Sequence, residues 1–222
     1  MELLVVIVII TILTVVSMPA ITSLLNGENT SRNVLVLSDS LEQAREYATA
    51  NNTYVWVAFN SATDSSGVNS LTVVVLSSND GTDPASATTA PWGSSSCSYG
   101  TVPSSEISLI SKILTLKHLS LLSAASFPVS SLPAMPVVTA SVNSAATSST
   151  GLFTIKLPAS TTASAFTQGI EFLPSGQARN SSSPVNAIDL DIQPQSGTAS
   201  NAQNVAVVRV NGLTGQAAVY RQ

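Results

Sequence analysis

The chain has 222 residues, of which 44% are hydrophobic and only 9% are charged, and its formal net charge is −4. A chain of this length can bury one sizeable core, and its acidic balance argues against a partner that is held mainly through phosphate contacts. The single cysteine, Cys97, excludes an intramolecular disulfide and lies in a Gly/Ser-rich stretch, where we expect an incidental thiol.

The chain begins with a long apolar run. Residues 3–21 are 19 residues without a charge, and as a helix they would extend about 28 Å, close to the thickness of a hydrocarbon core. The run therefore predicts a transmembrane helix, with Pro19 at a position where lipid tolerates a kink. A carboxylate such as that of Glu2 is energetically costly at the edge of an apolar run in lipid unless a cation lies beside it, so Glu2 indicates a partner that supplies a cation. The alternative is that Glu2 only favours a helix start through the helix dipole.

These residues resemble the start of type IV pilins and type II secretion pseudopilins, whose mature chains begin Phe-Thr-Leu-Ile-Glu-Leu-Leu-Val-Val-Ile. The resemblance implies that Glu2 pairs with the methylated N-terminal amine of a neighbouring subunit during assembly. The basic leader, the cleavage-site glycine and the Phe-Thr-Leu of that family do not precede Glu2, so we expect that Met1 marks a miscalled or trimmed start. The alternative is that this chain is not processed by a prepilin peptidase. The residues that match the family's assembly segment are Glu2, Leu3, Leu4, Val5 and Pro19.

The helix is predicted to continue beyond the apolar run, with a weak point at Asn26 and Gly27 and an end near Asn51 and Asn52. Its second half has apolar residues at intervals of three and four, which is typical of an amphipathic helix. We expect this stripe to pack on a sheet; it consists of Val34, Leu37, Leu41, Ala44 and Ala48.

After residue 52, short β-branched runs alternate with Gly, Pro and Ser clusters, which is typical of β-structure. Residues 53–60 and 71–77 predict an antiparallel hairpin. Two long polar stretches, 78–105 and 123–149, are predicted to be loop insertions, the second because its prolines exclude helix and central strand. Further strands are expected at residues 107–110, 113–122, 151–157, 187–192, 204–210 and 216–220.

A second resemblance lies near the C-terminus. Residues 170–176 are similar to the Ile-x-Phe-x-Pro-x-Gly segment of H-type pseudopilins and FimT-like minor pilins, with Phe172, Pro174 and Gly176 at the fixed positions. Pro174 fixes φ and Gly176 tolerates positive φ, so a strand here can turn back toward residues 187–192.

The last strands resemble the same family in a weaker way. Residues 204–210 and 216–220 are joined by a predicted turn that contains Gly212 and Gly215, as in the closing strand pair of these proteins. Gln216 stands where the family usually has arginine.

Catalytic and metal sites find little support in the sequence. His118 is the only histidine and is expected at the surface of a strand, so no catalytic triad is predicted. Asp189 and Asp191 alternate along one predicted strand and are expected to solvate its outer face, because no further carboxylates lie nearby. We therefore predict no enzyme activity, no cofactor, no metal and no small-molecule substrate.

The sequence as a whole predicts an α+β fold, in which a long N-terminal helix, half transmembrane and half amphipathic, packs on an antiparallel β-sandwich. The predicted parts are residues 1–25 for the transmembrane half, 26–52 for the amphipathic half and 53–222 for a β-rich head.

Three classes of function follow from this reading. The preferred one is a minor pilin or pseudopilin, anchored in the inner membrane with its head in the periplasm and then built into a filament. Its expected partners are other pilin subunits, the membrane before assembly and an inner-membrane assembly platform. The alternatives are a DNA-binding minor pilin, which the scattered basic residues disfavour, and a membrane-tethered enzyme.

Overall fold

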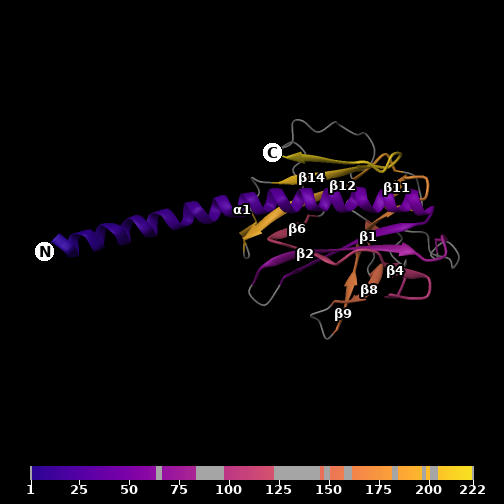
Figure 1. Cartoon of the computed structure of the whole chain (residues 1–222), viewed down its shortest axis with the longest axis horizontal. Helices are drawn as coiled ribbons and strands as arrows, with labels where there is room; N and C mark the ends of the chain where they lie inside the picture. Colours follow the sequence, from indigo (N-terminus) through magenta and orange to yellow (C-terminus); the bar gives the residue numbers. More distant parts are fainter. Residues whose placement is uncertain are drawn as a thin grey trace.

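The computed structural model describes residues 2–63, 67–83, 98–122, 146–147, 151–157, 162–181, 185–196, 199–200 and 205–221. Side chains of residues 16–28 within the N-terminal helix, and of the residues at either end of some other segments, are outside the description. Within these limits the chain forms one long helix and a β-rich head (Figure 1).

The helix α1 spans Glu2–Asn51 and runs without a break through Asn26 and Gly27, where a weak point was predicted. Fifty residues correspond to about 75 Å of helix. Figure 1 shows that its first part extends away from the head, while its second part lies along the head and ends at the opposite side. The difference follows from the sequence, because the amphipathic stripe begins only at Val34.

The described strands form three sheets, whose order is β11-β10-β1-β2-β4 with β5 and β7 attached, β13-β12-β14-β15 with β6 attached, and β3-β8-β9. All pairs are antiparallel except β3 with β8. The strands are β1 (Val55–Thr63), β2 (Asn69–Ser78), β3 (Thr101–Val102), β4 (Ile107–Leu109), β5 (Leu114–Lys117), β6 (Leu119–Leu121), β7 (Ala146–Thr147), β8 (Phe153–Lys156), β9 (Ala163–Phe166), β10 (Gln168–Phe172), β11 (Ala178–Arg179), β12 (Ala187–Ser196), β13 (Ala199–Ser200), β14 (Ala206–Asn211) and β15 (Ala217–Arg221).

The sheet that contains β1 and β2 is the middle layer, because both of its faces are covered. On one face, alternate residues such as Val57 and Val73 join the helix stripe and the β12-β14 sheet in the main core. On the other face, Trp56 and Val74 pack against the small β3-β8-β9 sheet. Residues 55–59 are consequently fully buried in an unbroken run, as expected for a strand that is covered on both sides.

The predicted fold class is wrong as a description of the chain. Most of the described regular structure is antiparallel β-sheet, and it forms three sheets where an antiparallel β-sandwich was predicted, although a sandwich of packed sheets is present. Across the residues that the structure describes, no helix combines the length and the apolar character needed to cross a membrane. The prediction of a transmembrane half of α1 is therefore wrong for the described residues.

Two further predictions need correction in detail. Residues 113–122 are not one strand: His118 has a positive φ of 61°, and the chain changes there from β5 in the middle sheet to β6 in the β12-β14 sheet. The turn at Pro174 returns the chain onto β11, beside β10, whereas β12 lies in the other sheet. The predicted loop at residues 78–105 contains the short strand β3, and half of this insertion and nearly all of residues 123–149 lie outside the described residues.

Candidate assembly helix and polar cleft

The first described side chains of α1, residues 4–15, form an apolar surface that the head does not cover. We call these residues the exposed segment. Ten of the twelve are Leu, Val or Ile, each between 46% exposed at Val8 and 71% exposed at Val15. The other two, Thr11 and Thr14, turn their hydroxyls back onto the carbonyls of Val8 and Ile10, at 2.8 Å each, so they add little polarity.

The predicted assembly residues fall at this end of the helix. Leu4 and Val5 belong to the exposed segment and are 66% and 55% exposed. The side chains of Glu2, Leu3 and Pro19 lie outside the described residues, although their backbone belongs to α1. The structure therefore places two of the five in an uncovered apolar surface and leaves the role of Glu2 as a prediction.

The second half of α1 is fixed to the head. All five residues of the predicted stripe, from Val34 to Ala48, are fully buried in the main core. Polar contacts that the sequence did not indicate add to this packing. The Glu42 carboxylate accepts the backbone N–H of Ala217 at 2.6 Å, and the Arg221 guanidinium donates to the hydroxyl and carbonyl of Ser31 at 2.8 and 2.9 Å. The C-terminal strand β15 thus clamps the helix where it leaves the head.

The two C-terminal motif turns meet beside this half of the helix. Gly176 and Gly215 both have positive φ, 83° and 67°. A Cβ on Gly215 would collide with the carbonyl oxygen of Gly176 and would stand 2.8 Å from Cδ of Arg45. Gly212 accepts the N–H of Ala178 at 2.9 Å, which joins the turn after β14 to the strand after Pro174. Phe172 is fully buried in the main core, and Pro174 is half-buried in the turn.

A buried ion-pair cluster lies at Glu171 of β10, whose register partner on β1 is Trp56. Glu171, which is fully buried, binds Arg179 through both carboxylate oxygens, and Arg179 also binds Asp83 at 2.6 Å. Tyr99 donates to the other oxygen of Asp83 at 3.0 Å. Burial raises the pKa of Glu171 to about 7, against the opposing effect of Arg179. The cluster ties two residues of the predicted 78–105 insertion, Asp83 and Tyr99, to Glu171 of β10 through Arg179, which indicates a structural role.

A second buried cluster contains Asp189 and Asp191, and it corrects the prediction that both are solvated. Each is 1% exposed. Asp189 forms a bidentate pair with Arg209 at 2.7 Å, and this guanidinium lies 5.8 Å from the ring centre of Tyr220. Both carboxylate oxygens of Asp191 are buried without a hydrogen-bond partner in the described residues. Burial and the neighbouring Asp189 raise the pKa of Asp191 to about 6.

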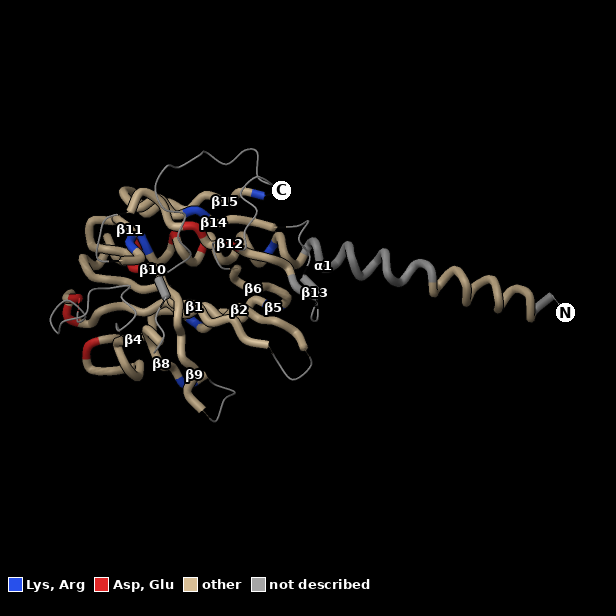
Figure 2. Tube along the Cα trace, turned by 180° about the vertical axis from the view of Figure 1, so that it is seen from behind, with Lys and Arg blue, Asp and Glu red and all other residues tan. Residues whose placement is uncertain are grey.

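The positions of the charged side chains give no sign of a nucleic-acid surface or a metal site. Figure 2 shows the basic residues scattered over the head, and half of the eight, Arg45, Arg179, Arg209 and Arg221, are engaged within the chain. Within the described part of the chain no group of three potential metal ligands is found. His118 is half-buried between β5 and β6, and Cys97 lies outside the described residues.

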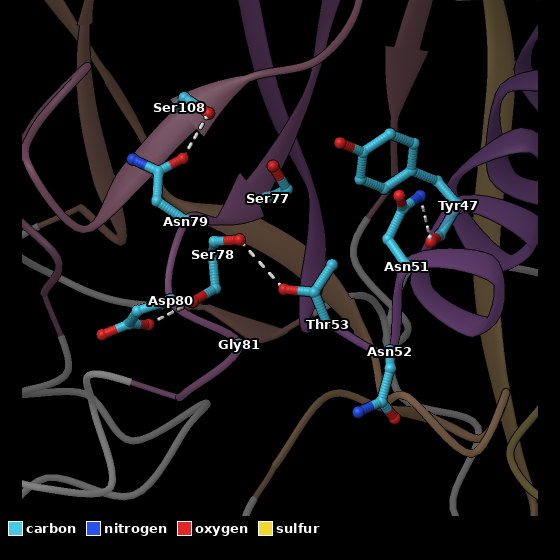
Figure 3. Close-up of a pocket in the computed structure, with 10 residues that line it drawn as sticks. All are labelled: Tyr47, Asn51, Asn52, Thr53, Ser77, Ser78, Asn79, Asp80, Gly81 and Ser108. Carbon is cyan, nitrogen blue, oxygen red and sulfur yellow. Dashed lines mark hydrogen bonds between the residues drawn. The ribbon is translucent and has the colours of Figure 1, made fainter.

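The polar cleft is a feature that the sequence did not indicate. It has a volume of about 450 Å³ and lies between the end of α1 and the segment that follows β2 (Figure 3). Because its members come from distant segments and carry ordinary polar side chains, no sequence motif marks them. The lining residues are Tyr47, Asn51, Asn52, Thr53, Ser77, Ser78, Asn79, Asp80, Gly81 and Ser108.

Comparisons with known proteins add no family to this picture. No protein-family model, no curated protein and no solved structure matches the chain. The pilin and membrane assignments of the sequence analysis are therefore without support from relatives, and the resemblance to pilins rests on the quoted residues alone.

Proposed function

We propose that this protein is a structural subunit that assembles with copies of itself or with similar subunits through the N-terminal part of α1. The observation that supports this function is the exposed segment, residues 4–15, in which ten large apolar side chains are uncovered and no residue is charged. A monomer rarely leaves so large a continuous apolar surface in water, and helices of this kind bury it by packing side by side.

The geometry of the head favours the same function. The helix is fixed to the head by a buried stripe and by Glu42 and Arg221, so the exposed segment is held out from a rigid body (Figure 1). Subunits of this shape can pack their helices into a common bundle while their heads remain outside. This is the arrangement that the resemblance to pilins and pseudopilins implies.

The test compares assembly of the full chain with that of a variant in which the exposed segment is made polar. Val8 and Ile12 are one helical turn apart and 46% and 58% exposed, so Val8→Gln with Ile12→Gln interrupts one face of the segment. Leu213→Gln is the matched control, because Leu213 is 63% exposed but lies on the head. Size is measured by analytical ultracentrifugation and shape by negative-stain electron microscopy.

We expect ordered oligomers or filaments from the unchanged chain and from the Leu213→Gln control, and monomers from the double variant. Amorphous aggregates without a defined subunit arrangement would contradict the proposal, and so would equal assembly of the double variant. An unchanged chain that stays monomeric over the whole concentration range would contradict it as well.

A further inference from the structure

The polar cleft is a candidate binding site that lies away from the proposed assembly segment. Its position, at the end of α1 where Asn51 is the last helical residue and Asn52 follows it, is on the side of the head opposite the projecting N-terminus (Figure 1). A cleft there stays accessible when the exposed segment is buried between subunits. Its volume of about 450 Å³ lies within the range of about 300–1,000 Å³ that is usual for small-molecule sites.

Hydrogen bonds within the chain fix the walls of the cleft. Thr53 donates to the carbonyl of Ser78 at 2.9 Å, Ser108 donates to the Asn79 side chain at 2.7 Å, and the Asn51 amide donates to the carbonyl of Tyr47 at 3.0 Å (Figure 3). Such a lining does not have to be ordered when a ligand enters, and this lowers the entropic cost of binding.

Other polar groups of the cleft are left available. No hydrogen bond within the described residues engages the side chains of Tyr47, Asn52 or Ser77, and Oδ1 of Asp80 takes all of its contacts from Ser78 and Thr82, which leaves Oδ2 open. Ser77 is only 3% exposed, so its hydroxyl lies deep in the cleft, and the Tyr47 ring is directed toward it from the helix (Figure 3).

The charges of the cleft limit the class of ligand. The ten lining residues include one carboxylate, Asp80, and no basic side chain, so the cleft offers no positive charge to an anion. Hydrogen bonds from the side chain and then the backbone of Thr82, with one from Ser78, lower the pKa of Asp80 and keep it an acceptor at neutral pH. A single carboxylate is too few for a calcium site, which usually needs several.

We propose that the cleft binds a saccharide, as a free sugar or as part of a glycan. Sugar hydroxyls are both donors and acceptors, which matches the hydroxyls of Tyr47 and Ser77, the amide of Asn52 and the carboxylate of Asp80. The Tyr47 ring, which is 36% exposed, offers a flat apolar face for the C–H groups of a pyranose and a hydroxyl at its end.

The experiment is saturation-transfer NMR on the full chain, with glucose, galactose, N-acetylglucosamine, maltose and lactose as probes at millimolar concentration. We expect transfer to at least one of these probes. Tyr47→Ala with Asp80→Asn should abolish it, and Ser77→Ala alone should weaken binding by about threefold to tenfold, the effect of one hydrogen bond. Thr115→Ala, which removes an exposed hydroxyl from β5 outside the cleft, is the control and should bind as the unchanged chain does.

Three results would overturn the proposal. These are no transfer to any of the probes, undiminished transfer in the folded Tyr47→Ala, Asp80→Asn variant, and binding of ethylammonium in place of the sugars, which would show that Asp80 selects a cation. Circular dichroism establishes that each variant is folded. Because none of these measurements depends on oligomer formation, their outcome is separate from that of the assembly test.

Discussion

The backbone of Gly215 approaches the carbonyl oxygen of Gly176 so closely that no side chain can stand between them. One glycine follows β14 and the other follows β10, so this contact joins the two larger sheets at the point where both meet α1 through Arg45 and Thr49. Two turns that look independent in the sequence are therefore parts of one junction.

Replacing Gly215 should test this junction. Gly215→Ala forces a Cβ into positive φ and against the Gly176 carbonyl, whereas Gly67→Ala, at a φ of 76° with open space around it, introduces only the backbone strain. We expect about 1 kcal/mol of lost stability for Gly67→Ala and at least about 2 kcal/mol more for Gly215→Ala, because overpacking adds to the strain. Urea unfolding of both variants measures the difference, and equal losses would mean that the contact can relax.

This junction also shows which contacts can be predicted from sequence patterns and which cannot. The helix stripe, the β1-β2 hairpin and the β14-β15 hairpin were predictable, because each depends on residues close together in the chain. The pairing of β1 with β10, the third sheet and the contact of the two glycine turns depend on segments far apart, which a local pattern does not specify.

The same reason explains the errors around the candidate sites. Asp189 and Asp191 are two positions apart on one strand, as residues on a solvated strand face are. Only the tertiary structure shows that Arg209 and its surroundings bury them. The apolar run at residues 113–122 reads as one strand because positive φ at His118 leaves no clear signal in the sequence. The polar cleft has no motif, since its walls combine a helix end with two strands.

The pH dependence of stability should carry the signature of Glu171. Its pKa is raised from 4.5 to about 7 in the folded state, chiefly by burial, so between these values the folded chain binds more protons than the unfolded chain. The contribution of this group is therefore fully present below pH 4.5 and is lost as the pH rises through about 7.

Glu171→Gln removes this titration while Asp83 still pairs with Arg179. The free energy of unfolding should then decline less steeply with pH between about 4.5 and 7 than it does in the unchanged chain. Glu106→Gln, at an exposed carboxylate, is the control and should leave the slope unchanged. Identical slopes for Glu171→Gln and the unchanged chain would show that Arg179 keeps Glu171 ionised throughout.

Asp191 and Asp189 should respond oppositely to the same substitution. Asp191 is buried without a hydrogen-bond partner in the described residues, so Asp191→Val removes an unfavourable group beside Val207 and should stabilise the fold by about 1–3 kcal/mol at pH 8. Asp189→Val leaves Arg209 buried without its bidentate partner, so this variant should destabilise the fold by about 3–5 kcal/mol.

The gain from Asp191→Val should also shrink at low pH. The pKa of Asp191 is raised from 3.8 to about 6, so the carboxyl is neutral in the folded chain below this value and costs less to bury. Thermal unfolding at pH 8 and pH 4.5 measures both effects. A loss of stability on Asp191→Val at pH 8 would indicate that this carboxylate has a favourable role in the fold.

The head should fold without the projecting part of the helix, and its boundary should be sharp. A chain that begins at Gly27 keeps buried Thr30, the Ser31 contacts of Arg221 and the whole stripe from Val34 onward. We expect it to be monomeric and as stable as the head of the full chain, because the exposed segment makes no contribution to the core.

A chain that begins at Leu35 loses Val34 and the hydrogen bonds between Ser31 and Arg221 of β15. It should be less stable by about 2–4 kcal/mol, the cost of one buried aliphatic side chain together with these hydrogen bonds. Size-exclusion chromatography and urea unfolding compare the two. Insoluble or unfolded protein from the Gly27 start would mean that the projecting helix is needed for folding, and equal stability of the two chains would mean that the clamp at Ser31 does not hold the helix.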